Sequence, residues 1–150
     1  MNERHLFRGK VANNSYNTEK RGSWIEGGVT YIERLAFITK SKNGILSSTL
    51  INPATIGQCT GLRDKNGILI FEGDIVKLDI TTIRIGGLPP SHDYTLYAKV
   101  KWHDDRAAWG LDNEGWGDVE LASDYDDIEA IGNIHDTPEL LEGETNGNNP

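Results

Sequence analysis

The apolar residues of this chain fall into short runs separated by glycine, asparagine and aspartate, a pattern that favours β-strands joined by tight turns. The pattern is clearest from Gln58 to Leu78, where two apolar segments flank Asn66-Gly67. Asparagine and glycine both tolerate a positive φ angle, so this dipeptide predicts a hairpin turn. After a second break at Glu72-Gly73-Asp74, the segment from Ile75 to Leu78 resumes the strand pattern.

Two further hairpins are predicted from the same kind of signal. Asn43-Gly44 separates the apolar run Leu35–Thr39 from Ile45–Ile51, so these runs should pair with each other. Tyr94–Trp102 alternates between apolar and polar positions, as a half-buried antiparallel strand does. Ala107–Leu111 should return beside that strand after a short turn.

Glycine and proline positions refine this picture. The pair Gly27-Gly28 interrupts a strand-like segment at residues 23–32 and predicts a bulge or a sharp bend there. Asn52-Pro53 and Thr137-Pro138 each combine an N-cap residue with proline at the first helical position, so each predicts one helical turn. The polar residues 143–150 predict a disordered tail.

Together these elements predict a mainly-β fold. Residues 61–134 should form a small antiparallel barrel of SH3-like type, because Gly73-Asp74-Ile75-Val76 enters a strand that is followed by a long loop and an alternating strand. The N-terminal β-hairpins should add a further sheet layer, and a short helical turn should follow near the C-terminus. Residues 1–142 should form a single domain.

Length and composition place few further limits on the protein. A chain of 150 residues can bury a core without disulfides, and its single cysteine, Cys59, suits a reducing compartment. There is no long apolar run and no signal-peptide core in the sequence, so we expect a soluble, cytoplasmic protein with no membrane partner.

The net charge of −8 is unevenly distributed. Residues 1–60 carry a net charge of +4, residues 61–110 are neutral and residues 111–150 carry −12. One interpretation is that the acidic third is a solvated face and tail. The other is that it meets the basic third, within one chain or between copies in an oligomer.

Few residues suggest reaction chemistry. His103 with Asp104 and Asp105, and His135 with Asp136, have ligand-like neighbours, but adjacent strand residues point to opposite faces, so turn formation explains them better. The acids between Asp124 and Glu129 lack the spacing of a calcium loop. We therefore predict no catalytic residue, no metal site, no cofactor and no enzymatic activity.

The aromatic and basic residues are the better candidates for binding. We predict that Trp102 and Trp109 are cross-strand neighbours of one hairpin, and core packing is the first interpretation of these rings. The alternative is an aromatic surface that binds a peptide or single-stranded nucleic acid. That surface would use Trp24, Tyr97, Trp109 and Trp116. The candidate phosphate contacts are Arg4, Arg8, Lys10, Lys20 and Arg21.

The segment Gln58–Leu78 resembles the YopX family of phage and prophage proteins, through its Gln-x-Thr-Gly-Leu-x-Asp-x-Asn-Gly and Phe-Glu-Gly-Asp-Ile-Val motifs. The closing Ile131-Gly132-Asn133-Ile134 with its Pro-Glu-Leu-Leu, and the N-terminal Phe7-Arg8-Gly9-Lys10 and Gly22–Gly27, are similar to that family as well. The resemblance covers almost the whole chain and implies a bacteriophage or prophage origin, but it carries over no catalytic residue.

Four functional hypotheses follow, of which the fourth, a hydrolytic enzyme, would need carboxylates or histidines that converge in a pocket. The first is a non-enzymatic phage or prophage interaction protein that self-associates as a homo-oligomer and has a host or phage protein as a further partner. The second is a nucleic-acid-binding accessory factor that uses the basic N-terminal third, although the net charge disfavours nucleic acid. The third is an acidic decoy that occupies a host protein through residues 112–144.

Overall fold

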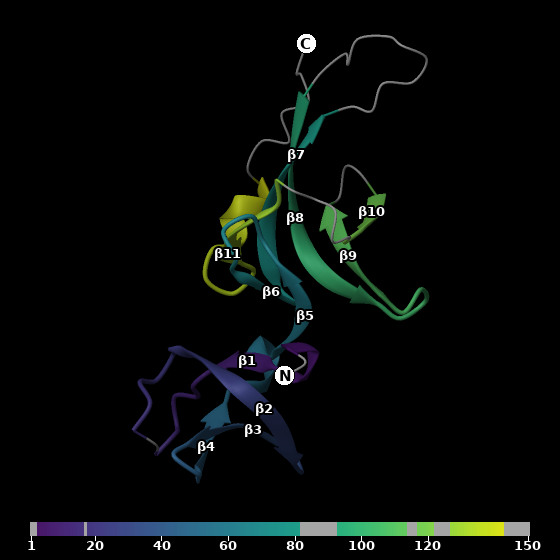
Figure 1. Cartoon of the computed structure of the whole chain (residues 1–150). Helices are drawn as coiled ribbons and strands as arrows, with labels where there is room; N and C mark the ends of the chain where they lie inside the picture. The colour runs from purple at the N-terminus through teal and green to yellow at the C-terminus, as the bar shows by residue number, and fades with distance from the viewer. Residues whose placement is uncertain (1–2, 17, 82–92, 114–116, 122–126, 143–150) are drawn as a thin grey trace. The chain divides into compact units, whose positions relative to one another are not determined.

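The structure is a computed structural model that describes residues 3–16, 18–81, 93–113, 117–121 and 127–142 (Figure 1). The fold is mainly β, with two antiparallel sheets, which confirms the predicted class. The elements in chain order are η1 (Glu3–His5), β1 (Phe7–Lys10), β2 (Trp24–Ile32), β3 (Leu35–Lys42), β4 (Ile45–Ile51), η2 (Pro53–Thr55), β5 (Gly57–Arg63), β6 (Leu69–Phe71), β7 (Asp74–Thr81), β8 (Asp93–His103), β9 (Ala108–Asn113), β10 (Gly117–Glu120), β11 (Glu129–Asn133) and η3 (Pro138–Glu142).

The chain divides into two compact units, Met1–Gly61 and Leu62–Pro150. The boundary falls within β5, at the residue where the predicted barrel segment begins. The sheet to which β5 belongs has the strand order β4-β3-β2-β1-β5-β6. The expectation of one domain over residues 1–142 stays a prediction, and the predicted tail at residues 143–150 lies outside the described residues.

Antiparallel hairpins make up most of the first unit. β2 pairs with β3 and β3 pairs with β4, the second hairpin turning at Asn43-Gly44 as predicted. Both turn residues have positive φ angles, 52° at Asn43 and 76° at Gly44, the conformation that asparagine and glycine adopt at least cost. Asn52 caps the 3-10 helix η2 by accepting a hydrogen bond of 3.1 Å from the backbone N–H of Ala54.

The glycine pair of β2 marks a change of pairing partner. β2 pairs with β1 up to Gly27, which faces Phe7 of β1. From Gly28 onward β2 pairs with β3, and Gly28 faces Thr39 of β3. Gly27 lies against the backbone carbonyl of Thr39 and the side chain of Ile38, so a side chain at this position would collide with β3. The predicted bend is thus the place where β2 passes from one ladder to the next.

The core of the first unit lies on one face of these strands. It consists of Val11, Ile25, Ile38 and Ile51, with Ile56 packed against them. The end of β4 returns to the segment after β1, because Val11 forms a β-bridge with Ile51 and the N–H of Ala12 donates to the carbonyl of Leu50 at 2.9 Å.

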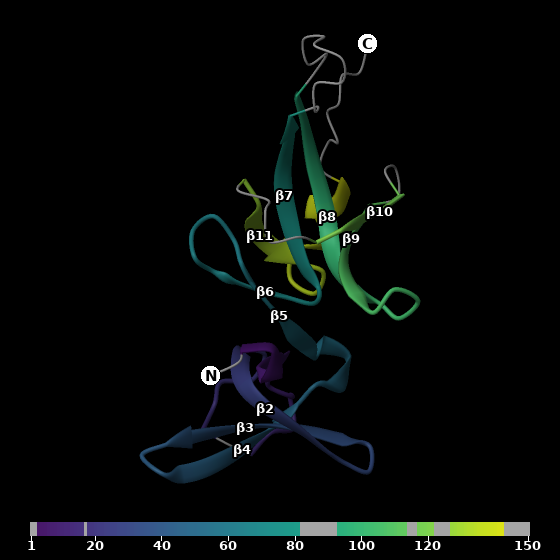
Figure 2. The same ribbon diagram turned by 45° about the vertical axis from the view of Figure 1, so that its right-hand side comes forward.

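The second unit contains a five-stranded sheet of order β10-β9-β8-β7-β11. Its longest ladder joins β7 and β8, which run side by side in both views (Figures 1 and 2). Leu96, Ala98 and Val100 of β8 are buried on one face, as the alternating sequence predicts. The sheet is open in the described residues, with β10 and β11 at its edges, so the expected closed SH3-like barrel is not formed by them.

The larger core lies within the second unit. Its buried members are Ile70, Val76, Leu78, Leu96, Ala98, Val100, Leu111, Leu121 and Ile128. The 3-10 helix η3 covers the segment where one helical turn was expected, and it begins at Pro138. Among the described residues, no helix is long and apolar enough to cross a membrane.

Candidate interaction site

Arg8, Lys10 and Trp24 form a basic aromatic cluster on β1 and β2. Lys10 and Trp24 are direct partners in the ladder. The guanidinium carbon of Arg8 lies 4.8 Å from the centroid of the Trp24 ring, and the Nζ atom of Lys10 lies 5.5 Å from it. Two cations over one half-buried indole are each stabilised by the ring quadrupole, by about 0.5–1 kcal/mol at a site that is partly exposed.

Gly9 explains how β1 holds these two cations. It alternates with Arg8 and Lys10 and is buried, facing the core rather than the indole. A Cβ atom at Gly9 would overlap the Cγ2 atom of Ile51 and would lie 3.4 Å from the Cδ1 atom of Ile38. The missing side chain lets β1 lie directly on the core, and strand alternation then places Arg8 and Lys10 on the opposite face.

The other three candidate phosphate contacts lie in different segments. Arg4 is exposed in η1, where its carbonyl accepts a hydrogen bond of 2.8 Å from the side-chain amide of Gln58. Lys20 and Arg21 are exposed in the segment before β2, and the carbonyl of Lys20 accepts from the hydroxyl of Ser23. Two of the five predicted cations therefore lie at Trp24.

The aromatic residues of the second unit lie on β8 and β9. Trp102 and Trp109 are ladder partners, as predicted, and their rings meet edge to face with centroids 5.1 Å apart. Trp109 is half-buried and packs against the core, whereas Trp102 is 37% exposed, so Trp102 is the more exposed ring of this pair. Tyr97 is half-buried on β8, and Trp116 lies outside the described residues.

An apolar surface that sequence reasoning missed lies on the strands β2, β3 and β4. Side chains alternate along each strand, and the ladder pairs Ile32 with Leu35, Phe37 with Leu50 and Ser41 with Leu46 on the face opposite the core. We call this surface the outer face and define its apolar members as Ile32, Leu35, Phe37, Leu46 and Leu50. The available signal was the run Leu35-Ala36-Phe37-Ile38, which is apolar at successive positions and therefore on both faces.

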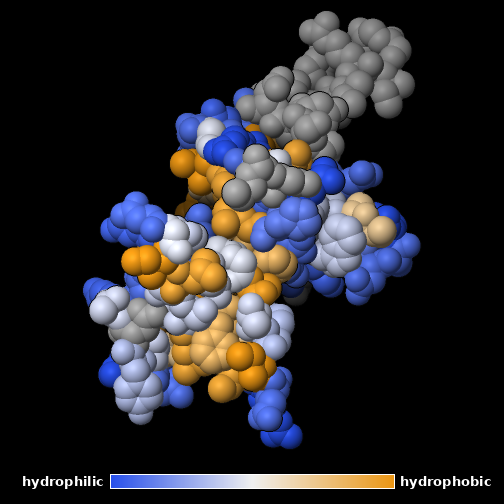
Figure 3. All heavy atoms as spheres, turned by 60° about the horizontal axis from the view of Figure 1, so that its bottom comes forward, coloured by the Kyte–Doolittle hydropathy of each residue, from blue (hydrophilic) through white to orange (hydrophobic). Residues whose placement is uncertain are grey.

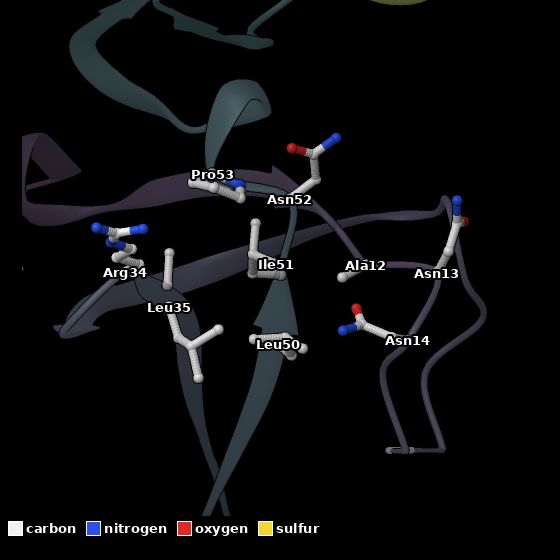
Figure 4. A pocket seen from close by; sticks show the side chains of 10 residues that line it. Ala12, Asn13, Asn14, Arg34, Leu35, Leu50, Ile51, Asn52 and Pro53 are labelled. Carbon is white, nitrogen blue, oxygen red and sulfur yellow. The ribbon is translucent and has the colours of Figure 1, made fainter.

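A pocket of about 350 Å³ opens beside the outer face (Figure 4). Leu35 and Leu50 of the outer face line it, together with Ala12, Asn13, Asn14, Arg34, Ala36, Ile51, Asn52 and Pro53. In Figure 4 the side chains of Leu35 and Asn14 point into the space from opposite sides. Aliphatic walls with a few amide groups and the guanidinium of Arg34 suit an apolar side chain of a ligand or partner that has polar groups beside it.

The buried carboxylates of the second unit have structural partners. Asp64 accepts hydrogen bonds from three backbone N–H groups, and Asp74 accepts one of 2.8 Å from the N–H of Phe71. Within the described ranges, no three His, Cys, Asp or Glu residues are grouped so that they could hold a metal ion. Of the acidic cluster considered in the sequence, Asp124 and Asp126 lie outside those ranges.

A comparison with models of protein families identifies the family of this chain. The family model described as YopX protein matches residues 6–142. The chain belongs to the YopX family. This YopX-family chain is also similar to the crystal structure of protein EF1440 from Enterococcus faecalis, with 24% identity over 90% of this chain and 96% of that chain and a TM-score of 0.46. No curated protein matched it.

Proposed function

We propose that this YopX-family chain is a non-enzymatic interaction protein of a bacteriophage or prophage, that it acts in the cytoplasm of the bacterial host and that it self-associates. One observation carries the proposal: exposed large apolar side chains gather on the hairpins β2–β3 and β3–β4 (Figure 3). They are Tyr31, Ile32, Leu35, Ile45 and Leu46. Ile32, Leu35 and Leu46 share one side of these strands, and an exposed apolar surface of this kind is typical of a contact with another protein.

The charge distribution also supports self-association. Residues 1–60 carry +4 and residues 111–150 carry −12, so two copies attract each other when the basic part of one approaches the acidic part of the other. This attraction acts on the rate of encounter and weakens with salt, whereas the apolar surface supplies the lasting contact.

Sedimentation velocity of the full chain tests the proposal directly. The weight-average sedimentation coefficient should rise over roughly a hundredfold increase in protein concentration, because self-association follows mass action. The rise should persist at high salt, since burial of apolar surface is not screened. A monomer at every concentration and at both low and high salt would overturn the proposal.

The cluster at Trp24 favours a second candidate function, binding of single-stranded nucleic acid. An indole with two adjacent cations provides a stacking ring and phosphate contacts in one place. If Arg8 and Lys10 each neutralise one phosphate, the affinity should fall about sevenfold between about 50 and 200 mM salt.

Fluorescence anisotropy with a labelled oligonucleotide measures that change. Replacing both cations, Arg8→Gln and Lys10→Gln, should abolish most of the salt dependence. The matched control, Lys20→Gln with Arg21→Gln, removes the same charge from the exposed segment before β2 and should leave the affinity within about twofold. Equal losses in the two double variants would argue against a specific role of Trp24.

A further inference from the structure

We infer that the outer face is the contact by which two copies of this chain pair about a two-fold axis. This inference rests on the proposed self-association and assigns it to one surface. The partner that covers this surface is a second copy of the chain. Tyr31 and Ile45 are exposed as well, but they lie on the opposite side of their strands and are not part of this contact.

The position of each side chain follows from the strand registers. On β3, Ala36 and Ile38 are buried and face the core, so Leu35 and Phe37 face away from it. On β4, Thr49 and Ile51 are buried in the same way. The residues on the outer face from the glycine pair onward are therefore Gly28, Thr30, Ile32, Leu35, Phe37, Thr39, Ser41, Leu46, Ser48 and Leu50.

None of these residues carries a charge, although a quarter of the chain is charged. The lysines of β3, Lys40 and Lys42, fall on the opposite side of the strand, and Lys40 forms an ion pair of 3.1 Å with Glu19. In a two-fold contact a surface meets itself, so every charge on it would oppose like charge. An uncharged apolar face avoids that repulsion, and its residues offer no cation to nucleic acid or an acidic peptide.

The hydroxyl groups of Thr39 and Ser48, 2.7 Å apart, form a polar pair in the middle of the outer face. Phe37 and Leu50 lie on one side of this pair along the strands, and Ser41 and Leu46 lie on the other. In the dimer the outer faces of the two copies lie against each other, and we place the two-fold axis midway between them. The axis runs perpendicular to the strands and passes the pair formed by Thr39 and Ser48. Residue 46 of one copy then lies over residue 50 of the other.

In this arrangement a side chain of the second copy fills the pocket beside the outer face. Leu50 and Leu35 line the pocket, and Leu46 of the second copy is the side chain that the axis places above them. Leu46 is 72% exposed, so the second copy would remove most of its apolar surface from water. Because of the two-fold symmetry, Leu46 of each copy would enter the pocket of the other, one at each end of the contact.

Neighbouring residues of β4 offer a matched test. Leu46 and Ile45 are equally exposed, at 72%, but lie on opposite faces of the strand. We expect Leu46→Glu to weaken dimerisation at least about a hundredfold, since it buries an unpaired carboxylate in the contact. Ile45→Glu should change it less than about threefold. Sedimentation velocity gives both dissociation constants, and circular dichroism checks that each variant is folded.

Cysteine cross-linking tests the same contact without a substitution at Leu46. Ser48→Cys places a thiol at the proposed axis, and Ser47→Cys places one on the opposite face of the same strand. A short bis-maleimide should link two copies through position 48 and not through position 47.

Equal linking at both positions, or equal loss of dimer in Leu46→Glu and Ile45→Glu, would overturn the assignment of the contact to the outer face and leave self-association standing. A wild-type chain that remains monomeric at all concentrations would instead overturn the proposed function, and this inference with it.

Discussion

The Oδ2 atom of Asp64 accepts a hydrogen bond of 3.0 Å from the backbone N–H of Ala130, which lies 66 residues further along the chain. The Oδ1 atom of the same carboxylate accepts two more, each 2.9 Å long, from the N–H groups of Asn66 and Ile68. Lys65 adds a backbone hydrogen bond to Ile128. The turn that the sequence marks most strongly is therefore also bonded to the start of β11, in addition to the pairing of β11 with β7.

Replacing Asp64 by alanine should destabilise the second unit by about 2–4 kcal/mol. The substitution leaves backbone donors of the turn and of β11 without their acceptor, and a buried donor that loses its partner costs more than the hydrogen bond itself contributed. Urea unfolding at neutral pH measures the effect. The control Asp105→Ala, in the exposed turn after β8, should stay within about 0.5 kcal/mol of wild type.

The same carboxylate should make stability depend on pH in the acid range. Burial by itself raises the pKa of Asp64, but the N–H donors of Ala130, Ile68 and Asn66 and the charge of Lys65 outweigh it, so the pKa is lowered below its ordinary value. A group with a lowered folded-state pKa stabilises the fold above its unfolded value, about pH 4, and that stabilisation is lost as the pH falls through the folded pKa.

The comparison of wild type with Asp64→Asn isolates this contribution. Asparagine does not titrate, so the difference in unfolding free energy between the two proteins should be constant from pH 7 to about pH 5 and should shrink below about pH 4. Denaturant titrations at several pH values provide the measurement. A difference that stays constant to the lowest pH at which wild type folds would show that the hydrogen bonds do not hold the pKa down.

Gly9→Ala should destabilise the first unit by about 1–3 kcal/mol, because the added methyl group would enter the space of Ile51 and come within contact of Ile38. Gly28→Ala is the matched control, since it changes glycine in a strand where a Cβ atom would meet nothing within 4 Å. Thermal unfolding followed by circular dichroism compares the two. Similar losses would mean that backbone freedom, and not space in the core, decides the use of glycine at these positions.

The local part of the fold could be predicted from the sequence because turns and strands are specified by neighbouring residues. Asn43-Gly44 predicted the β3–β4 hairpin, and the alternation from Tyr94 to Trp102 predicted the buried side of β8. The open sheet at the place of the expected barrel could not be predicted in this way, because closure depends on pairing between strands that are distant in the chain.

The candidate site was predicted only in part for the same reason. Ladder pairing between β1 and β2 brings Lys10 to Trp24, and the spacing of these residues in the sequence does not reveal it. The outer face was missed because its members come from three strands, and because an apolar residue such as Leu46 looks like a core residue until the face it occupies is known. Registers supply that information, and a single sequence does not.

The tryptophan pair of the β8–β9 hairpin provides a last test, because its two rings differ in burial. Trp109→Ala should cost about 3–5 kcal/mol, since it removes a ring that packs against the core as well as the edge-to-face contact with Trp102.

Trp102→Ala removes the same ring contact from a residue that is 37% exposed, so it should cost about 1–2 kcal/mol. Urea unfolding of both single variants and of the double variant gives the two costs and the coupling between the rings, which we expect to be about 0.5–1.5 kcal/mol. Equal costs for the two single variants would mean that the pair stabilises the hairpin alone and that the core does not depend on Trp109.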